Sequence, residues 1–278
     1  MAGDNGMGGK IVTITSGKGG VGKTTATANI GVALAQLGKR VVLIDADIGL
    51  RNLDVVMGLE NRIVYNLVDV AEGRCKLRQA MIKHKLLPDL HLIPASQTRD
   101  KSAVSQSDMI QVSDWLRPEV DFVLIDSPAG IERGFRNAIA PADDVLIVTN
   151  PEVSAVRDAD RIIGLLEAAG KGPGKLVLNR IRQDMVHKGE MLSADDVTDI
   201  LAIKMIGIVP EDQFVVPASN KGVPVVLNEE SRAGLAYHNI ARRLNGENVP
   251  FLPLEEEDGF LRRLTRLFSG GNQLLKQG

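Results

Sequence analysis

Residues 17–24 read Gly-Lys-Gly-Gly-Val-Gly-Lys-Thr, the strongest motif in the chain. It matches G-x-x-x-x-G-K-[ST], a glycine-rich turn between a strand and a helix that binds phosphate groups. An apolar run at residues 10–15 and a helical pattern at residues 24–37 supply that context. Glycines let backbone N–H groups converge on phosphate oxygens, and a helix N-terminus favours negative charge. The segment therefore predicts a nucleotide-phosphate site inside an α/β fold.

Short β-branched runs alternate with helical patterns along the rest of the chain, as far as residue 244. Most of these runs are apolar throughout, which is typical of strands covered on both faces of a parallel sheet. We therefore expect one doubly wound α/β domain, with a mostly parallel sheet of about seven or eight strands and helices on both faces. The predicted strands are residues 10–15, 40–45, 121–126, 144–150, 175–179, 205–209 and 223–227, and the clearest predicted helices are 24–37, 107–116, 154–169, 194–202 and 231–244.

The composition excludes several classes of protein. The chain has 278 residues, 44% hydrophobic and 24% charged, and its net charge of −2 gives no support to binding nucleic acid. Cys75 is the single cysteine, so an intrachain disulfide and a metal-cluster site that needs two cysteines per subunit are both ruled out. No apolar run reaches the roughly 18–20 residues that span a bilayer. We expect neither a secreted nor an integral membrane protein.

Acidic residues follow two of the predicted strands, where open α/β sheets bind their ligands. Asp45 and Asp126 are predicted with Thr24 as ligands of Mg²⁺, directly or through water. Asp47 lies two residues beyond Asp45 and is better placed to orient the attacking water. Lys23 would neutralise charge on the β- and γ-phosphates. Either acid alone could instead be a helix cap or a turn residue, but the pair beside one phosphate loop favours the metal site.

Further segments carry a family resemblance: residues 44–54 (IDADIGLRNLD), 126–132 (DSPAGIE), 149–161 (TNPEVSAVRDADR) and 209–213 (VPEDQ). With GKGGVGKT, in this order and spacing, they resemble the MinD family of deviant Walker A ATPases. The resemblance runs from about residue 10 to residue 244 and resumes near the C-terminus. It implies a division-site selection switch that binds ATP and Mg²⁺, forms an ATP-dependent homodimer and hydrolyses ATP slowly until a partner stimulates it.

The resemblance also implies roles for individual residues. Lys18 would reach across the dimer interface and act in catalysis with Lys23 and Asp47. Arg157, Asp158 and Asp160 lie where the family meets a MinC-like inhibitor and a MinE-like activator, although a solvated helix face explains these three equally well. The predicted nucleotide contacts are Gly17, Lys18, Gly19, Gly20, Val21, Gly22, Lys23, Thr24, Thr25, then Glu152 near the partner subunit's nucleotide, and Asn179, Arg180, Pro210, Glu211 and Asp212 around the adenine.

Residues 259–268 (GFLRRLTRLF) predict an amphipathic helix that binds an anionic membrane surface. The alternative is a helix docked on the protein's own core. At 100° per residue, five apolar side chains share an arc of about 120° and arginines fill the opposite side. Two copies on one dimer should bind far more firmly than one. The predicted membrane contacts are Phe260, Leu261, Arg262, Arg263, Leu264, Arg266, Leu267 and Phe268.

The predicted organisation is a flexible N-terminus (1–9), an ATPase domain (10–248), a Pro- and acid-rich linker (249–258), the membrane helix (259–268) and a flexible extension (269–278). Phe251, in the linker, receives no role. We expect a cytoplasmic protein that attaches reversibly to the inner face of the cell membrane, with plastid stroma and inner envelope left open. Two alternatives stay open as well: a ParA-type partition ATPase, which predicts a basic DNA-binding surface, and a MinD-related flagellar-placement ATPase.

Overall fold

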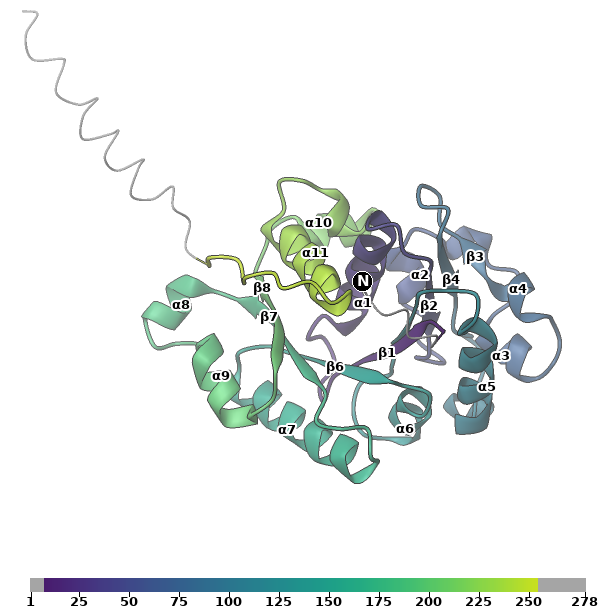
Figure 1. The fold of residues 1–278 in the computed structure, drawn as a ribbon, viewed down its shortest axis with the longest axis horizontal. Coiled ribbons are helices and arrows are strands. Elements are labelled where there is room, and N and C mark those ends of the chain that lie inside the picture. The colour runs from purple at the N-terminus through teal and green to yellow at the C-terminus, as the bar shows by residue number, and fades with distance from the viewer. Residues whose placement is uncertain (1–7, 255–278) are drawn as a thin grey trace, which may run out of the picture.

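An eight-stranded sheet forms the centre of the computed structural model, which describes residues 8–254 (Figure 1). The strand order is β3-β4-β2-β5-β1-β6-β7-β8, and among the described residues every pairing is parallel except that of β3 with β4. The predicted doubly wound, mostly parallel sheet is confirmed. The strands are β1 (Lys10–Thr15), β2 (Val41–Asp45), β3 (Ile82–Lys83), β4 (Leu90–Ile93), β5 (Phe122–Asp126), β6 (Asp144–Thr149), β7 (Lys175–Ile181) and β8 (Met205–Pro210).

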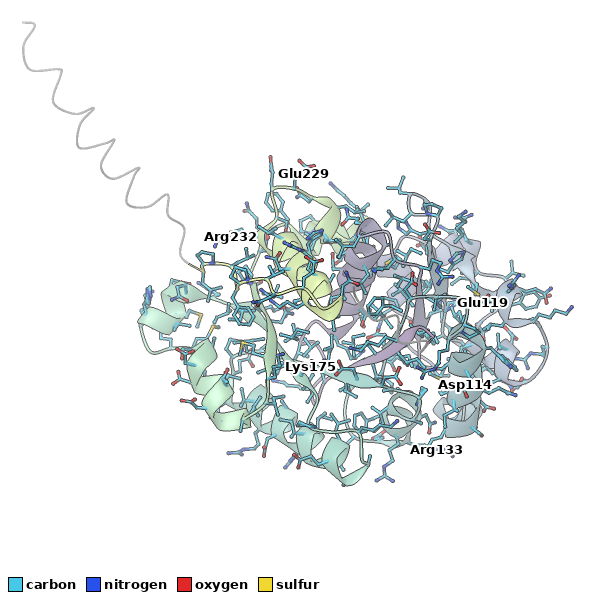
Figure 2. All side chains as sticks on the ribbon, in the orientation of Figure 1. Asp114, Glu119, Arg133, Lys175, Glu229 and Arg232 are labelled. Atoms are coloured by element: carbon cyan, nitrogen blue, oxygen red, sulfur yellow. The ribbon has the colours of Figure 1, made fainter. Side chains whose placement is uncertain are left out.

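Helices cover both faces of this sheet. One face carries α1 (Lys23–Gln36), α2 (Leu53–Val56), α10 (Val215–Asn220) and α11 (Arg232–Leu244). The other face carries α3 (Leu67–Ala71), α4 (Leu77–Ala80), α5 (Gln106–Leu116), α6 (Arg133–Ile139), α7 (Val153–Ala168), α8 (Gln183–His187) and α9 (Ala194–Leu201). Charged side chains such as Asp114, Arg133 and Glu229 project from the outer surface (Figure 2).

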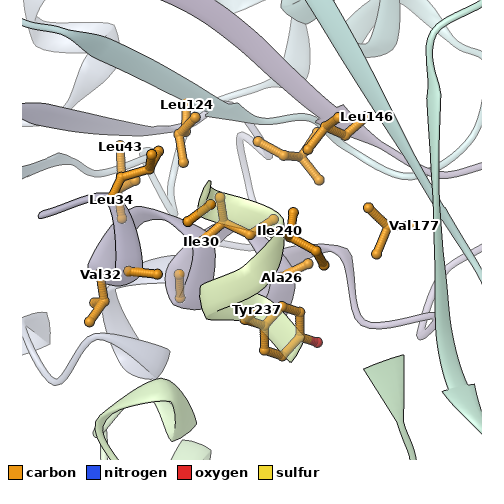
Figure 3. Close-up of a cluster of buried hydrophobic side chains, with 14 of the residues drawn as sticks. Ala26, Ile30, Val32, Leu34, Leu43, Leu124, Leu146, Val177, Tyr237 and Ile240 are labelled. Atoms are coloured by element: carbon orange, nitrogen blue, oxygen red, sulfur yellow. The ribbon is translucent and has the colours of Figure 1, made fainter. Parts of the chain in front are cut away.

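Alternate residues of the strands supply two separate cores. Val12 and Ile14 of β1 belong to the cluster beneath α1 and α11, whereas Ile11 belongs to the cluster beneath α3 and α5. This alternation explains why the strand sequences are apolar throughout: both faces of the sheet are buried. Figure 3 shows the first cluster, in which helix residues Ala26, Ile30, Val32, Leu34, Tyr237 and Ile240 lie with strand residues Leu43, Leu124, Leu146 and Val177.

The predicted strand at residues 223–227 is wrong. The segment forms a turn of 3-10 helix, η3 (Val225–Leu227), after Pro224. Its backbone is not paired with a strand, because Val226 N–H donates to the Asn29 side chain of α1 over 2.8 Å. Proline cannot donate a hydrogen bond to a sheet, so its presence argues against a central strand. Two strands were also missed, β3 and β4, since both are short and β4 (LHLI) contains a polar residue.

Several predictions fall outside the described residues. They are the flexible termini before residue 8 and from residue 269, the acidic part of the linker (255–258) and the membrane helix at residues 259–268. Within residues 8–254, no helix is long and apolar enough to cross a bilayer.

Candidate nucleotide site

The glycine-rich loop lies between β1 and α1 at the carboxyl end of the sheet. Gly20 and Gly22 have φ of 79° and 94°, the left-handed region that favours glycine. Gly22 is the N-cap of α1, and its lack of a side chain leaves the first N–H groups of the helix accessible. Those N–H groups and the helix dipole together make a site for an anion. The predicted phosphate loop therefore has the geometry that its motif requires.

Asp126 joins the strand β5 to the phosphate loop. Its carboxylate accepts hydrogen bonds from Lys23 Nζ at 2.8 Å and from Thr24 Oγ1 at 2.7 Å. The side chains of Lys23 and Asp126 are 7% and 1% exposed, so this is a buried ion pair. Thr27 Oγ1 also donates to Asp126, over 3.2 Å. The sequence analysis missed Thr27, although its position one helical turn after Lys23 is the available signal.

The donor set around Asp126 fits Mg²⁺. A threonine hydroxyl and a carboxylate oxygen lie within hydrogen-bond distance of each other at the mouth of the phosphate loop. No group of three His, Cys, Asp or Glu side chains that could hold a metal occurs among residues 8–254. Mg²⁺ suits such a place, because it binds through one or two protein ligands and completes its octahedron with phosphate oxygens and water.

Asp45 lies beside Asp126, its partner in the parallel register of β2 and β5. Its side chain is fully buried and accepts backbone N–H bonds from Asp47 at 3.0 Å, Asn52 at 3.2 Å and Leu53 at 3.1 Å. Burial and the neighbouring Asp126 carboxylate raise the pKa of Asp45 to about 7. The geometry shows Asp45 holding the loop at residues 47–52 in place. Its predicted role as a metal ligand stays a prediction.

The same loop places Asp47 at a hollow of about 340 Å³ in front of the phosphate loop. Two residues of the loop have left-handed backbones: Gly49 with φ of 97° and Arg51 with φ of 45°. Arg51 also forms an ion pair of 2.9 Å with the buried Asp54. Residues lining the hollow are Ser16, Gly19, Gly20, Gly22, Lys23, Thr24, Thr25, Asp47, Leu50, Asn52, Val56, Ala129 and Arg180.

A second recess adjoins the first at Gly22, Thr25 and Arg180. The structure brings all the predicted adenine residues to it, namely Asn179, Arg180, Pro210, Glu211 and Asp212. Sequence reasoning missed Val215, Val216 and Tyr237, which line the recess from α10 and α11. No local motif marks these three, because their side chains reach the recess only through the packing of the two helices.

Asn179 connects this recess to the phosphate loop through a hydrogen bond. It is 4% exposed, and its Nδ2 donates to the Val21 carbonyl oxygen over 2.8 Å. Tyr237 Oη donates in turn to Asn179 Oδ1 over 3.4 Å, and burial raises the pKa of Tyr237. Arg180, the next residue, has φ of 59°. Such strain in a non-glycine residue is common at ligand sites.

Lys18 extends from the loop toward the start of α7. Its Nζ lies 3.6 Å from Glu152 Oε2 and donates to Ser154 Oγ over 3.4 Å. The Lys18 and Glu152 side chains are 45% and 54% exposed, so water screens their attraction. The two residues that the family resemblance assigns to a neighbouring subunit's nucleotide therefore share one exposed edge. Ser154 was not among the predicted site residues.

Helix α7 packs directly against the loop at Gly17. A Cβ on Gly17 would lie only 2.4 Å from the carbonyl oxygen of Asp158. Arg157 and Asp160 are exposed on the outer side of α7, while Asp158 is half-buried and lies 3.7 Å from Arg161 in an ion pair. The structure thus places Asp158, one of the three predicted regulator residues, against the phosphate loop, and the partner-binding role of all three stays a prediction.

Comparisons with known proteins agree with this geometry. Residues 12–225 match the model of the CobQ/CobB/MinD/ParA nucleotide binding domain. The chain is 53% identical over 264 residues to the septum site-determining protein MinD of Synechocystis, covering 94% of this chain and 99% of that protein. A MinC:MinD cell division complex from Aquifex aeolicus contains a similar structure, with TM-score 0.83 and 50% identity over 88% of this chain and 99% of that chain. MinD of Pyrococcus horikoshii, complexed with Mg-ADP, has TM-score 0.78 and 29% identity over 85% of this chain and 96% of that chain.

Proposed function

The chain belongs to the MinD family of septum site-determining ATPases, and we propose that ATP binding makes it a dimer that attaches to a membrane and recruits a division inhibitor. It is an ATP hydrolase that uses ATP and Mg²⁺ and acts in division-site selection. Hydrolysis then returns the dimer to monomers and releases them from the membrane. The observation that carries the proposal is the buried contact among Lys23, Thr24 and Asp126 in front of a glycine loop.

The residues of the site divide the work of phosphoryl transfer. Thr24 and Asp126 would hold Mg²⁺, which when bound neutralises charge on the β- and γ-phosphate oxygens. Lys23 neutralises further charge on the same phosphates, and backbone N–H groups of the loop hold them in line. Asp47, whose loop is fixed by the hydrogen bonds to Asp45, orients the attacking water. Asn179 keeps the loop and the adenine recess at a constant spacing.

Dimerisation would complete the site. Lys18 lies on an exposed edge with Glu152 and Ser154 and makes no contact shorter than 3.4 Å with them. Such a weak, solvated pair costs little to exchange for a nucleotide phosphate of a second subunit. In the dimer we expect Lys18 to contribute the positive charge that an arginine finger supplies in other P-loop enzymes. Hydrolysis would then depend on the dimer.

Attachment to the membrane is assigned to residues 259–268. Three arginines on the polar face suit anionic lipid, at roughly 1 kcal/mol each, and the apolar face suits the interface between headgroups and acyl chains. One copy is close to break-even because ordering the helix costs about 1 kcal/mol per residue. When a dimer carries two copies, binding of the first helix holds the second at a high local concentration near the membrane, so the dimer binds more firmly than a monomer. The protein would therefore alternate between the cytoplasm and the inner face of the membrane, following its nucleotide.

The exposed side of α7 is the proposed place for regulators. Arg157, Asp160 and the half-buried Asp158 offer charges of both signs there. The related chain from Aquifex aeolicus occurs in a complex with MinC. We assign a MinC-like inhibitor and a MinE-like activator to this surface in a host that has them. A DNA partner is not proposed, since the net charge of −2 gives no general attraction to phosphate backbones.

Sedimentation with vesicles tests the proposal. Vesicles of phosphatidylcholine and phosphatidylglycerol are mixed with protein and ATP, ADP or no nucleotide. The full chain should pellet with ATP and remain in the supernatant otherwise. A chain ending at Leu254 should bind ATP and remain in the supernatant in every case. Pelleting of this truncated chain with ATP would overturn the membrane assignment, and an ATP-dependent shift of DNA would favour the ParA-type alternative.

A further inference from the structure

Residues 249–254, which we call the exit strap, connect α11 to the segment that the proposed function assigns to the membrane. The sequence suggested only a Pro- and acid-rich linker here. In the structure the strap runs from the end of α11 past β8 (Figure 1). Leu252 packs against the core cluster beneath α1 and α11, and Leu254 packs against the cluster beneath α7 and α9. The strap thus contacts the cores on both faces of the sheet.

Arg243, near the end of α11, holds the first half of the strap. Its Nε donates to the Val249 carbonyl over 2.8 Å, and its Nη2 donates to the Pro250 carbonyl over 2.6 Å. Its Nη1 donates to the Ile206 carbonyl of β8 over 3.0 Å. All three nitrogens of one guanidinium are therefore engaged, two with the strap and one with the sheet.

The Phe251 ring covers the Arg243 guanidinium. The Arg243 guanidinium carbon lies 4.4 Å from the centre of the Phe251 ring, a cation–π distance. The guanidinium is partly buried, and this burial lowers the pKa of Arg243, with Arg242 lowering it further. Charged hydrogen bonds strengthen when water is excluded. Phe251, to which the sequence assigned no role, serves to shield the clamp.

Arg232, at the other end of α11, holds the second half of the strap through a hydrogen bond from Nη2 to the Pro253 carbonyl. The residue lies where the described chain ends (Figure 2). Its neighbours Ser231 and Ala233 both donate to Asp212, the carboxylate beside the adenine recess, over 2.7 and 2.9 Å. One helix therefore carries a wall of the nucleotide site and both clamps of the strap.

We propose that Arg243 is a positioning residue that fixes where the membrane-binding segment leaves the domain. This inference rests on the proposed membrane attachment. With the strap held, only residues 255–258 separate the fixed Leu254 from the predicted helix at residue 259. With the strap released, the tether would grow to residues 245–258, from the end of α11 onward. A fixed exit keeps the two helices of a dimer near each other and near one membrane plane.

The expected effect follows from the tether length. Effective concentration falls roughly as the −3/2 power of the length of a flexible tether. Lengthening the tether from four to fourteen residues should therefore weaken the second helix's contribution roughly six-fold. ATP hydrolysis in solution should be unchanged, because Arg243 does not touch the nucleotide site.

The experiment compares Arg243→Ala with Arg242→Ala. Arg242 pairs with Glu247 over 2.7 Å and makes no hydrogen bond to the strap that the structure shows, so its variant is the matched control. Chymotrypsin cleavage of the Phe251–Leu252 bond reports whether the strap is released. Sedimentation with the anionic vesicles and ATP reports affinity. Arg243→Ala should be cleaved several-fold faster, because it frees the first half of the strap. It should bind vesicles more weakly by up to about six-fold, the value for a strap released in full. Arg242→Ala should match the unaltered chain in both.

A second variant tests the effect of tether length without changing Arg243, in case Arg243→Ala does not fold. Ten Gly/Ser residues inserted after Leu254 lengthen the tether to the same extent and leave the clamp intact. This variant should bind vesicles about six-fold more weakly, with unchanged cleavage at Phe251. Full vesicle binding by the insertion variant, or unchanged cleavage in Arg243→Ala, would overturn the inference. If the unaltered chain itself fails to pellet with ATP, the membrane assignment fails, a result distinct from either of these.

Discussion

Replacing Gly22 by alanine should destabilise the nucleotide-free protein by about 2–4 kcal/mol, and the structure divides this cost into parts. The left-handed backbone at Gly22, with φ of 94°, costs a residue with a Cβ roughly 1–2 kcal/mol. The new Cβ would lie 2.2 Å from Asn179 Nδ2, which must move away. Loss of its buried bond to the Val21 carbonyl costs about 1–3 kcal/mol. Alanine also lowers the conformational entropy of the unfolded chain, and this effect stabilises the folded protein by about 0.4–1 kcal/mol.

Two other glycines of the loop are matched controls. Gly20 has φ of 79° but open space around its Cβ direction, so Gly20→Ala should cost only about 1 kcal/mol. Gly19 has open space as well and no left-handed φ, so Gly19→Ala should leave stability within about 0.5 kcal/mol. All three changes alter the loop whose backbone N–H groups are predicted to hold the phosphates, so all three should weaken nucleotide binding.

Urea unfolding followed by circular dichroism, without nucleotide and with EDTA, measures the three stabilities. Binding of a fluorescent ATP analogue measures the site separately. The double variant Gly22→Ala with Asn179→Ala should be destabilised by about 1–2 kcal/mol less than the sum of its single variants, because the Asn179 bond is lost only once. A Gly22→Ala protein no less stable than Gly20→Ala, or additive behaviour of the double variant, would refute the reasoning.

Three further predictions concern the charged residues of the site. Lys18→Ala should change the free energy of unfolding by less than about 0.5 kcal/mol, since its pair with Glu152 is exposed, yet should abolish the dimer-dependent ATP turnover, measured as phosphate release; normal turnover would contradict a role for Lys18 across the dimer. Asp126→Ala should cost about 3–5 kcal/mol in urea unfolding, because it leaves the Lys23 ammonium buried and unpaired, and Mg-ADP should no longer protect the variant; a loss below 1 kcal/mol would contradict the buried pair. The pKa of Asp45 is raised from 3.8 to about 7 in the folded state, so its contribution to stability is present at low pH and lost as the pH rises through 7. From pH 6 to pH 8 the unaltered chain should therefore lose about 1 kcal/mol relative to Asp45→Asn in metal-free urea unfolding, and parallel pH profiles would show that Asp45 is already ionised.

The parts of the fold that local chemistry determines were predictable. Strands buried on both faces are apolar throughout, and six of the seven predicted runs are strands β1, β2, β5, β6, β7 and β8. The seventh, at residues 223–227, has the same composition but contacts α1 and α11 instead of a strand. A β-branched run adopts whichever backbone its tertiary partners satisfy, and the sequence does not identify those partners.

The candidate site shows the same division. The loop at residues 17–24 is identified by the spacing of its glycines and lysine. Asp126 is identified by its place at the end of a predicted strand. Tyr237 reaches the predicted adenine recess from a helix almost 60 positions after Asn179 in the chain, and only packing brings the two together. Arg243 reads in the sequence as a surface arginine near a helix end. Its three carbonyl partners become visible only when β8 and the strap are in place.

The contact between Gly17 and Asp158 has a consequence for control of the enzyme. A Cβ at Gly17 would overlap the backbone of α7, so at this point no side chain separates the phosphate loop from that helix. A protein seated on the outer side of α7, over Arg157 and Asp160, would be separated from Gly17 of the phosphate loop only by that helix. An activator would then need no relay of residues across the domain, because a small displacement of α7 would itself displace the loop. A partner that binds the outer side of α7 and displaces this one helix would thus control when ATP is hydrolysed.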